Sequence, residues 1–204
     1  MINFNYKVIH IRGKEDRYNN IIRNQNKLEQ KIEIFDAIIG EQVDLGNMSI
    51  FGSLLQDSAE YTFINEIGCY LSHFMLVKSI ASSGYTIVFE DDFDIIHNNL
   101  HDKVKDIISK VDDFDLIYLG NINNNHAKQH KDNIYTVDVS SYLWGTYAYI
   151  INDKSAKRIY NKLRPMRLAI DNQYKMLIDK EELKAYVIYP PLVNQSKILK
   201  STIR

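Results

Sequence analysis

Residues 83–92 have the sequence SGYTIVFEDD, in which an apolar run ends abruptly in three carboxylates. The apolar part, from Tyr85 to Phe89, is β-branched and aromatic and follows Gly84, which is typical of a buried strand. In open α/β sheets, ligands bind beyond the carboxyl ends of the strands. We therefore expect a ligand site directly after this strand.

The three carboxylates, Glu90, Asp91 and Asp92, carry the chemistry of this stretch. Adjacent acids repel one another unless a cation lies among them. Hard oxygen ligands favour Mg²⁺ or Mn²⁺, and these ions in turn favour phosphate oxygens. The triplet therefore predicts a metal–diphosphate site and an activated nucleotide substrate. The alternative is a solvated acidic turn after a strand, and these residues alone do not separate the two.

The composition is that of a folded globular protein with balanced charge. The chain has 204 residues, of which 45% are hydrophobic and only 3 are proline. This length and composition predict one α/β domain spanning residues 1–204. The formal net charge of -1 gives no electrostatic reason to bind nucleic acid.

The single cysteine and the absence of long apolar runs bear on location. One cysteine, Cys69, excludes an internal disulfide and fits a reducing compartment. Its apolar helical surroundings favour a buried structural thiol over a nucleophile. The sequence shows no signal peptide and no apolar run long enough to cross a bilayer. We expect a cytoplasmic protein whose basic tail (Lys197, Lys200, Arg204) is either solvated or in weak contact with the inner face of an anionic membrane.

Strand-like and helix-like segments alternate along the chain, which predicts an α/β sheet with right-handed crossovers. Hydrophobic periodicity places strands at residues 6–11, 32–37, 85–89, 116–119, 134–139, 147–151 and 186–189, and helices at 15–30, 65–82, 100–111, 153–163 and 169–177. The segments 41–61 and 121–131 are expected to be loops, the first of them a mobile loop that covers a site.

Several of these segments, in order, resemble glycosyltransferase family 25, which includes bacterial lipooligosaccharide galactosyltransferases and collagen galactosyltransferases. The most characteristic block is EIGCYLSH at residues 66–73 followed by IVFEDD at 87–92. Similar to the family as well are VIHI at 8–11 with Asp16-Arg17, FDA at 35–37, WGTYAY at 144–149 with Ser155-Ala156, Ile170-Asp171, and YPPLV at 189–193 with Gln195. Two positions depart from the pattern: His10 stands where the family usually has Asn, and Ile39 where an acid commonly precedes Gly40.

The resemblance implies a GT-A-type fold, a Rossmann-like α/β sheet flanked by helices. It also implies that Glu90, Asp91 and Asp92 bind the ribose and a divalent metal, Mn²⁺ or Mg²⁺, that bridges the two phosphates. Of the carboxylates we favour Asp92 as the direct ligand, with Glu90 beside it. An inverting enzyme needs a base that faces the acceptor hydroxyl, and Asp171 is our candidate. The alternative for Asp171 is an N-terminal helix cap.

Four further residues gain candidate roles in donor binding from the resemblance. Arg17 is expected to contact the donor phosphate or nucleotide unless it lies on an exposed helix surface. His73 is expected to touch substrate or orient a carboxylate, although a histidine within a helix is more often structural. Trp144 offers an aromatic face for a sugar, with core packing as the alternative. Gly145 either allows a close backbone approach or forms a turn.

Three functions from different classes remain open on this sequence. The leading one is metal-dependent, inverting transfer of a hexose, with galactose from UDP-galactose favoured, onto a saccharide or hydroxylated peptide acceptor. The second is metal-dependent nucleotidyl or phosphoryl transfer, although the chain lacks a phosphate-cradling glycine loop. The third is a non-catalytic protein that binds sugar nucleotides or glycans.

Overall fold

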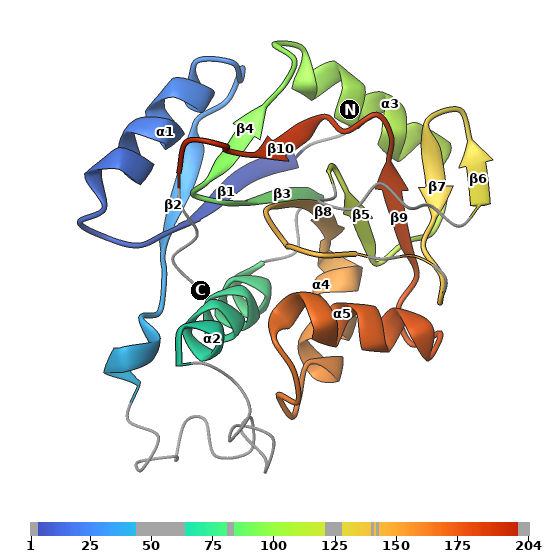
Figure 1. Cartoon of the computed structure of the whole chain (residues 1–204). Coiled ribbons are helices and arrows are strands. Elements are labelled where there is room, and N and C mark those ends of the chain that lie inside the picture. Colours follow the sequence, from blue (N-terminus) through green and yellow to red (C-terminus); the bar gives the residue numbers. More distant parts are fainter. Residues whose placement is uncertain are drawn as a thin grey trace.

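The computed structural model describes residues 4–43, 64–80, 84–120, 128–139, 141 and 143–199. Its centre is a mixed eight-stranded sheet with the strand order β2-β1-β3-β8-β5-β9-β7-β6 (Figure 1). The strands are β1 (Phe4–His10), β2 (Ile32–Asp36), β3 (Tyr85–Glu90), β5 (Leu116–Tyr118), β6 (Lys128–Lys131), β7 (Ile134–Thr136), β8 (Ala148–Asn152) and β9 (Ala185–Ile188).

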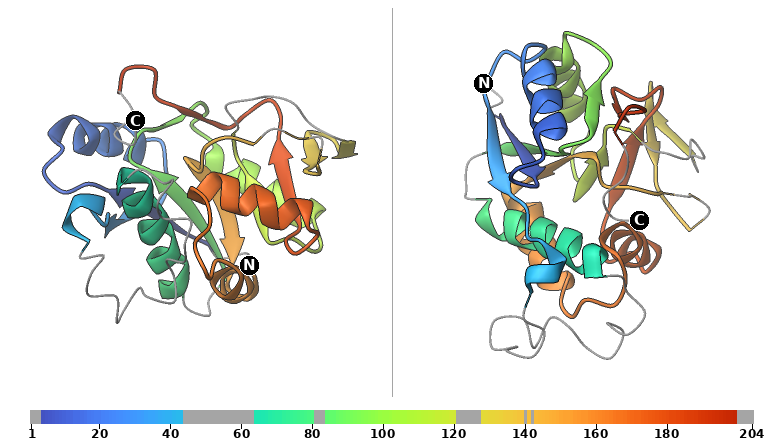
Figure 2. Two further views of the ribbon diagram at one scale, coloured as in Figure 1. Left: turned by 60° about the horizontal axis from the view of Figure 1, so that its bottom comes forward. Right: turned by 60° about the vertical axis from the view of Figure 1, so that its left-hand side comes forward.

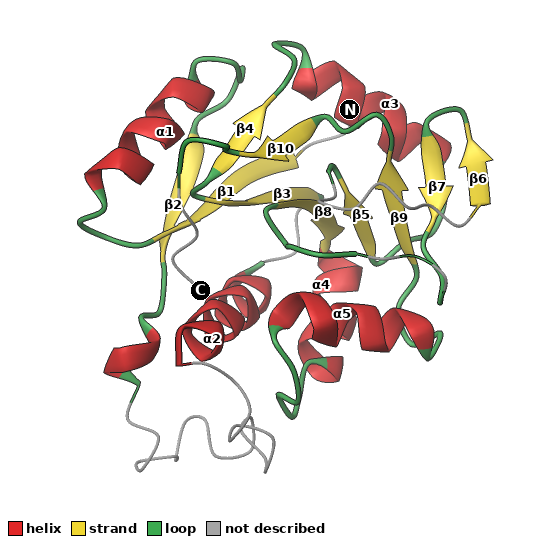
Figure 3. Ribbon diagram, in the orientation of Figure 1, coloured by secondary structure: helices red, strands yellow, loops and turns green. Residues whose placement is uncertain are grey.

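Helices cover both faces of this sheet. On one face lie α1 (Glu15–Gln25) and α3 (Leu100–Lys110), and on the other lie α2 (Ile64–Ser79), α4 (Asp153–Lys162) and α5 (Ile170–Asp179) (Figure 3). The two rotated views agree with this layering (Figure 2). A large sheet between two layers of helices confirms the predicted α/β class, of the Rossmann-like kind found in GT-A folds. No helix among the described residues is long and apolar enough to span a membrane.

The alternation of side chains along β3 divides the core between the two faces. Val88 belongs to the cluster beneath α2, α4 and α5, whereas Ile87 and Phe89 belong to the cluster beneath α1 and α3. Successive side chains of a strand point to opposite faces. Glu90, two residues after Val88, therefore faces α2.

Strand direction brings three chain segments to one edge of the sheet. β1 and β3 are parallel, with Ile9 opposite Glu90, so both end at this edge. β8 is antiparallel to β3, with Ala148 opposite Phe89, so it begins there. The end of β1, the acid triplet and residues 144–146 therefore lie together.

The structure also corrects several element boundaries. The first helix ends at Gln25 rather than residue 30, the strand expected at 134–139 ends at Thr136, and residues 128–131 form β6 instead of a loop. A small antiparallel sheet of β4 (Phe93–Ile95) and β10 (Val193–Gln195) was not predicted, because three residues are too few to set an alternation. The first two residues of the expected covering loop, Glu41 and Gln42, belong to a 3₁₀ turn, η1 (Gly40–Gln42). Residues 44–61 and 121–127, with Lys200 and Arg204 of the tail, lie outside the described residues.

Candidate active site

The three adjacent acids turn in three directions at the edge of the sheet. Glu90 ends β3 and faces α2, whereas Asp91 and Asp92 form the turn into β4. Asp91 is held from the α1 side, and Asp92 is held from the β10 side. Like charges placed next to one another in the chain are thus separated into three surroundings.

Glu90 is held by α2 and by the segment before β8. Its Oε1 lies 3.3 Å from Nε2 of His73 and accepts a 2.5 Å hydrogen bond from Oγ1 of Thr146. His73 is fully buried, and its Nδ1 lies 3.0 Å from the hydroxyl of Tyr149. Burial raises the pKa of Glu90, but the hydrogen bonds from His73 and Thr146 and the charge of Arg17 outweigh it, so that the pKa lies below its usual value. Glu90 is therefore ionised at neutral pH.

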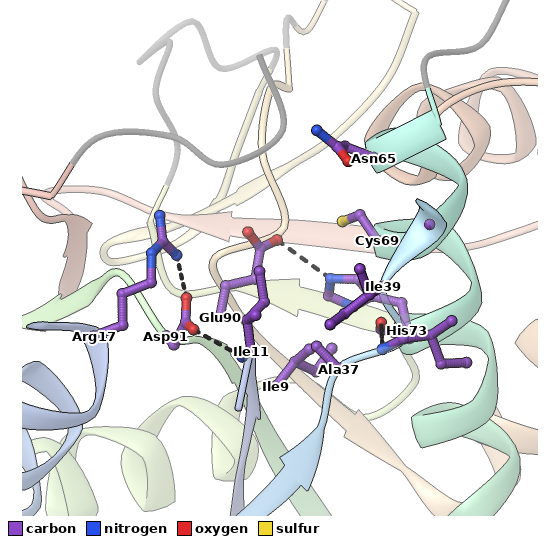
Figure 4. Close-up of a pocket in the computed structure, with 13 residues that line it drawn as sticks. Ile9, Ile11, Arg17, Ala37, Ile39, Asn65, Cys69, His73, Glu90 and Asp91 are labelled. Atoms are coloured by element: carbon purple, nitrogen blue, oxygen red, sulfur yellow. Dashed lines mark hydrogen bonds and ion pairs between the residues drawn. The ribbon is translucent and has the colours of Figure 1, made fainter. Parts of the chain in front are cut away.

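Asp91 has partners at both carboxylate oxygens. Oδ1 pairs with Arg17 of α1, and Oδ2 lies 3.1 Å from the amide nitrogen of Ile11 (Figure 4). Oδ2 also lies 3.0 Å from Nδ1 of His10. The side-chain amide of Asn20 donates to the Asp91 carbonyl at 3.0 Å. Asp91 thus joins β1, α1 and the turn after β3.

Asp92 is the carboxylate with an unmet oxygen. Its Oδ2 accepts a 3.0 Å hydrogen bond from the amide of Gln195, and Nη2 of Arg17 lies 3.8 Å away. Its Oδ1 is buried and has no hydrogen-bond partner among the described residues. Burial and the nearby charge of Glu90 raise the pKa of Asp92 to about 6. An oxygen of this kind suits a cation or a donor that the protein itself does not supply.

The C-terminal strand β10 is held over Asp92 by contacts with the end of β5. The amides of Leu192 and Val193 donate to the Leu119 carbonyl at 2.8 and 3.2 Å. At Gly120 a Cβ would lie 1.9 Å from the Val193 carbonyl oxygen, so only glycine allows this approach. The amide of Ser196 then donates to the Asp92 carbonyl at 2.6 Å, which fixes the turn from both sides.

The N-terminal half of α2 packs directly against the backbone that follows β2. A Cβ on Gly68 would lie 2.6 Å from both Ile38 O and Gly40 N, and the amide of Ile38 donates to Oγ of Ser72 at 2.8 Å. This contact sets His73 and Cys69 beside Glu90 around a cavity of about 90 Å³. Figure 4 shows these side chains with Arg17 and Asp91 on the opposite wall.

Cys69 fits the predicted unreactive thiol. It is partly buried, and burial together with the charges of Glu90 and Asp171 raises its pKa well above the usual value. The thiol therefore stays protonated at neutral pH, and the thiolate is the nucleophilic form.

Asp171, Trp144 and Gly145 form a second group next to Glu90. The amide of Gly145, which has a φ of 87°, donates to Oδ2 of Asp171 at 3.2 Å. Helix α5 begins at Ile170 with Ala169 as its N-cap, so Asp171 is not the cap; its Oδ1 accepts from the amide of Asn172 at 2.8 Å. Trp144 is 52% exposed, which excludes packing in the buried core.

The structure thus gathers the candidate residues into two adjoining groups. Arg17, His73, Glu90, Asp91 and Asp92 surround the strand end, and the Asp171 group joins them through Thr146, which follows Gly145 and binds Glu90.

Sequence reasoning assigned no role to four of the residues that hold the triplet: His10, Asn20, Thr146 and Gln195. Thr146 and Gln195 lie inside segments that resemble the family, which was the available signal. Asn20 lies in a polar helix with no pattern to single it out.

A family comparison covers most of the chain. Residues 3–174 match the model of glycosyltransferase family 25, described as an LPS biosynthesis protein family. The match includes both groups of the site up to Asp171, but not β10.

Individual relatives have low sequence identity to this chain and are longer than it. Procollagen galactosyltransferase 1-A of Xenopus laevis is 25% identical over 193 residues, and procollagen galactosyltransferase 2 of Homo sapiens is 21% identical over 213 residues. These alignments cover 88% and 91% of this chain and 32% and 34% of the relatives. Inactive glycosyltransferase 25 family member 3 of Mus musculus is 24% identical over 196 residues, which cover 89% of this chain and 33% of that protein. The chain therefore spans about a third of the length of the curated relatives it matches.

Proposed function

This chain belongs to glycosyltransferase family 25, and from that premise we propose that it is a metal-dependent, inverting glycosyltransferase. The proposed reaction moves a hexose, with galactose from UDP-galactose as the favoured donor, onto a saccharide or hydroxylated peptide acceptor. The observation that carries the proposal is the unmet, buried oxygen of Asp92 at the carboxyl end of β3. Relatives named procollagen galactosyltransferases support the choice of galactose.

The residues present fit a hard divalent cation. Asp92 and Glu90 offer carboxylate oxygens, which are the ligands that Mn²⁺ and Mg²⁺ prefer. Burial first, and the charge of Glu90 second, raise the pKa of Asp92, and a cation beside Oδ1 would offset both by favouring the ionised carboxylate. Such a metal, when bound, supplies Lewis-acid stabilisation to the departing diphosphate.

The chain's own residues supply the remaining parts of the proposed mechanism. His73 and Thr146 hold Glu90 in place, and Arg17 brings a positive charge between Asp91 and Asp92. The exposed ring of Trp144 offers an apolar face for a sugar. Asp171 accepts a hydrogen bond from the amide of Gly145, the residue after Trp144. In this proposal Asp171 takes the proton from the acceptor hydroxyl.

A non-catalytic role in binding sugar nucleotides is the second candidate. The observation that favours it is the similarity to a relative whose name describes it as inactive. No observation favours nucleotidyl or phosphoryl transfer over glycosyl transfer.

A ligand screen followed by a transfer assay tests the proposal. A ligand that binds only the native state raises the melting temperature, so UDP-galactose with Mn²⁺ should stabilise the protein more than Mn²⁺ or the nucleotide sugar alone. Release of UDP in the presence of acceptor should follow. Stabilisation without turnover across an acceptor panel would favour the non-catalytic role. The absence of metal-linked stabilisation would contradict the metal-dependent transferase, and the absence of any stabilisation by nucleotide sugars would contradict both.

The variant Asp171→Asn tests the proposed base. Its transfer rate should fall by roughly 10²–10⁴-fold, because a general base assists the chemical step, while binding of UDP and metal stays normal. The amide keeps an oxygen for the Gly145 hydrogen bond, and the melting temperature should stay near that of the wild type. Near-normal turnover would place the base elsewhere, and a product that retains the donor's anomeric configuration by NMR would refute inversion.

A further inference from the structure

Three side chains on the α2 side of the site form a set of donor atoms that the proposed transfer does not use together. They are the thiol of Cys69, the imidazole of His73 and the carboxylate of Glu90, and one donor atom of each lies within 4.8 Å of the other two. Cys69 and His73 are four residues apart in α2, so they lie on one face of the helix. All three side chains line the same cavity (Figure 4).

We propose that Cys69, His73 and Glu90 form a binding site for a thiophilic divalent cation, best fitted by Zn²⁺. Thiolate, imidazole and carboxylate are the ligands that Zn²⁺ takes in proteins, whereas Mg²⁺ and Mn²⁺ prefer oxygens. Tetrahedral zinc sites place their donor atoms about 3.3–3.8 Å apart. Nε2 of His73 and Oε1 of Glu90 already lie 3.3 Å apart, so closure needs only a small rotation of side chains.

Neighbouring groups already orient two of the three ligands. The Tyr149 hydroxyl lies 3.0 Å from Nδ1 of His73, which leaves Nε2 directed at Glu90. Thr146 donates a hydrogen bond to the same oxygen, Oε1, of the Glu90 carboxylate. Histidine ligands of metals generally bond through their second nitrogen to such a partner, which fixes the ring and raises affinity.

The charge and geometry of the set leave one coordination position for an outside ligand. Thiolate and carboxylate together balance the two positive charges of the ion. Binding releases the thiol proton to solvent, so affinity should increase with pH. Three protein ligands leave the fourth tetrahedral position to a water or another oxygen from the cavity.

Glu90 belongs both to the proposed Zn²⁺ site and to the proposed site of the catalytic metal, so Zn²⁺ binding should affect the transfer reaction. A Zn²⁺ ion bound to Cys69, His73 and Glu90 withdraws Glu90 from a catalytic Mn²⁺, so Zn²⁺ should inhibit a Mn²⁺-supported reaction. This consequence alone rests on the proposed function; the site itself does not.

Titration of the whole chain with Co²⁺, under reducing conditions, tests the site directly. Co²⁺ replaces Zn²⁺ and shows a sulfur-to-cobalt charge-transfer absorption when a thiolate binds it. Because Cys69 is the only cysteine, that absorption reports on this residue. We expect it to saturate at one Co²⁺ per chain, to be displaced by Zn²⁺, and to vanish in Cys69→Ser.

Two histidine variants and a tyrosine variant complete the test. His73→Gln should lower the cobalt affinity at least tenfold, whereas His130→Gln, at an exposed position on β6, should leave it unchanged. Tyr149→Phe should keep the absorption but lower the affinity by roughly 10-fold. Melting curves without metal establish that each variant is folded. If Cys69→Ser does not fold, His73→Gln and Tyr149→Phe decide the question. A wild-type protein without the absorption, or an equal affinity in His73→Gln, would overturn the proposal.

Discussion

Asp91 and Asp92 are neighbours in the chain and equally buried, each 3% exposed, yet their surroundings differ. On the α1 side, both oxygens of Asp91 have partners, among them Arg17 and His10. On the β10 side, Asp92 has one partner at Oδ2 and none at Oδ1 among the described residues. The comparison separates two uses of a buried acid. A carboxylate with all its partners stabilises the fold, and one with an unmet oxygen is available to a ligand.

The largest expected effect on stability comes from replacing Asp91, whose two carboxylate oxygens both have partners. Asp91→Asn removes a carboxylate charge that pairs with the buried guanidinium of Arg17, and Asp92 lies farther from that guanidinium, at 3.8 Å, so the free energy of unfolding should fall by about 3–5 kcal/mol. Chemical denaturation measures this loss. The matched control is Asp94→Asn, because the half-exposed Asp94 pairs with Lys27 at 3.3 Å and should lose under about 1 kcal/mol. Equal losses in the two variants would contradict the structural role of Asp91.

The next largest effect is a pH dependence of the free energy of unfolding that arises from Asp92. Its pKa is raised from 3.8 to about 6, so the folded state holds a proton that the unfolded state has already lost between these values. Stability due to this group is therefore fully present below pH 3.8 and is lost as the pH rises through 6, by about 3 kcal/mol in all. In a metal chelator, the difference in unfolding free energy between wild type and Asp92→Asn isolates this group. A difference that stays constant from pH 4 to 7 would contradict the environment described for Asp92.

Asp92→Asn should also reduce the stabilisation that UDP with Mn²⁺ gives to the wild type, because it alters the carboxylate that carries the unmet oxygen Oδ1. At a concentration of UDP and Mn²⁺ near 100 times the dissociation constant, wild type should gain about 2.7 kcal/mol, and Asp92→Asn should gain far less. Thermal melting with and without Mn²⁺ measures the gain. Equal UDP affinity for both proteins in chelator and in Mn²⁺ would remove Asp92 from the metal site.

The smallest effect concerns Gln195, whose side chain donates a hydrogen bond to Asp92. Gln195→Ala removes the donor to Oδ2 and should cost about 1 kcal/mol at neutral pH, while raising the pKa of Asp92 further. Asn194→Ala is the matched control, because Asn194 is an exposed neighbour on β10. A cost that is the same for the two variants would show that β10, and not the hydrogen bond, accounts for it.

The sequence predicted the fold well where segments are long and periodic. The continuous apolar run from Tyr85 to Phe89 and the apolar face of residues 100–111 correspond to β3 and α3. It failed at β4 and β10, three residues each, which exist because they pair with each other and not because of any local preference.

The sequence identified the three acids of the site, but not which of them keeps an oxygen without a partner. The acid triplet was found because three charges after an apolar run are conspicuous in a sequence. Which acid keeps an unmet oxygen depends on His10, Arg17 and Gln195, and Gln195 lies 103 residues beyond Asp92. Partners at that separation are set by the folded sheet, and no local pattern contains them.

That separation also fixes the order in which the centre can be assembled. On the ribosome, β1, α1 and β3 are complete once the turn at Asp91 has emerged, so the contacts of Arg17 and His10 are available early. Gln195 of β10 and Ser196 after it are made about a hundred residues later, and the amide of Val193 in β10 donates to the carbonyl of Leu119, which follows β5. Closing so long a loop costs entropy that only the docked strand returns. During synthesis, the residues that hold Asp91 are therefore complete before the residues that hold Asp92.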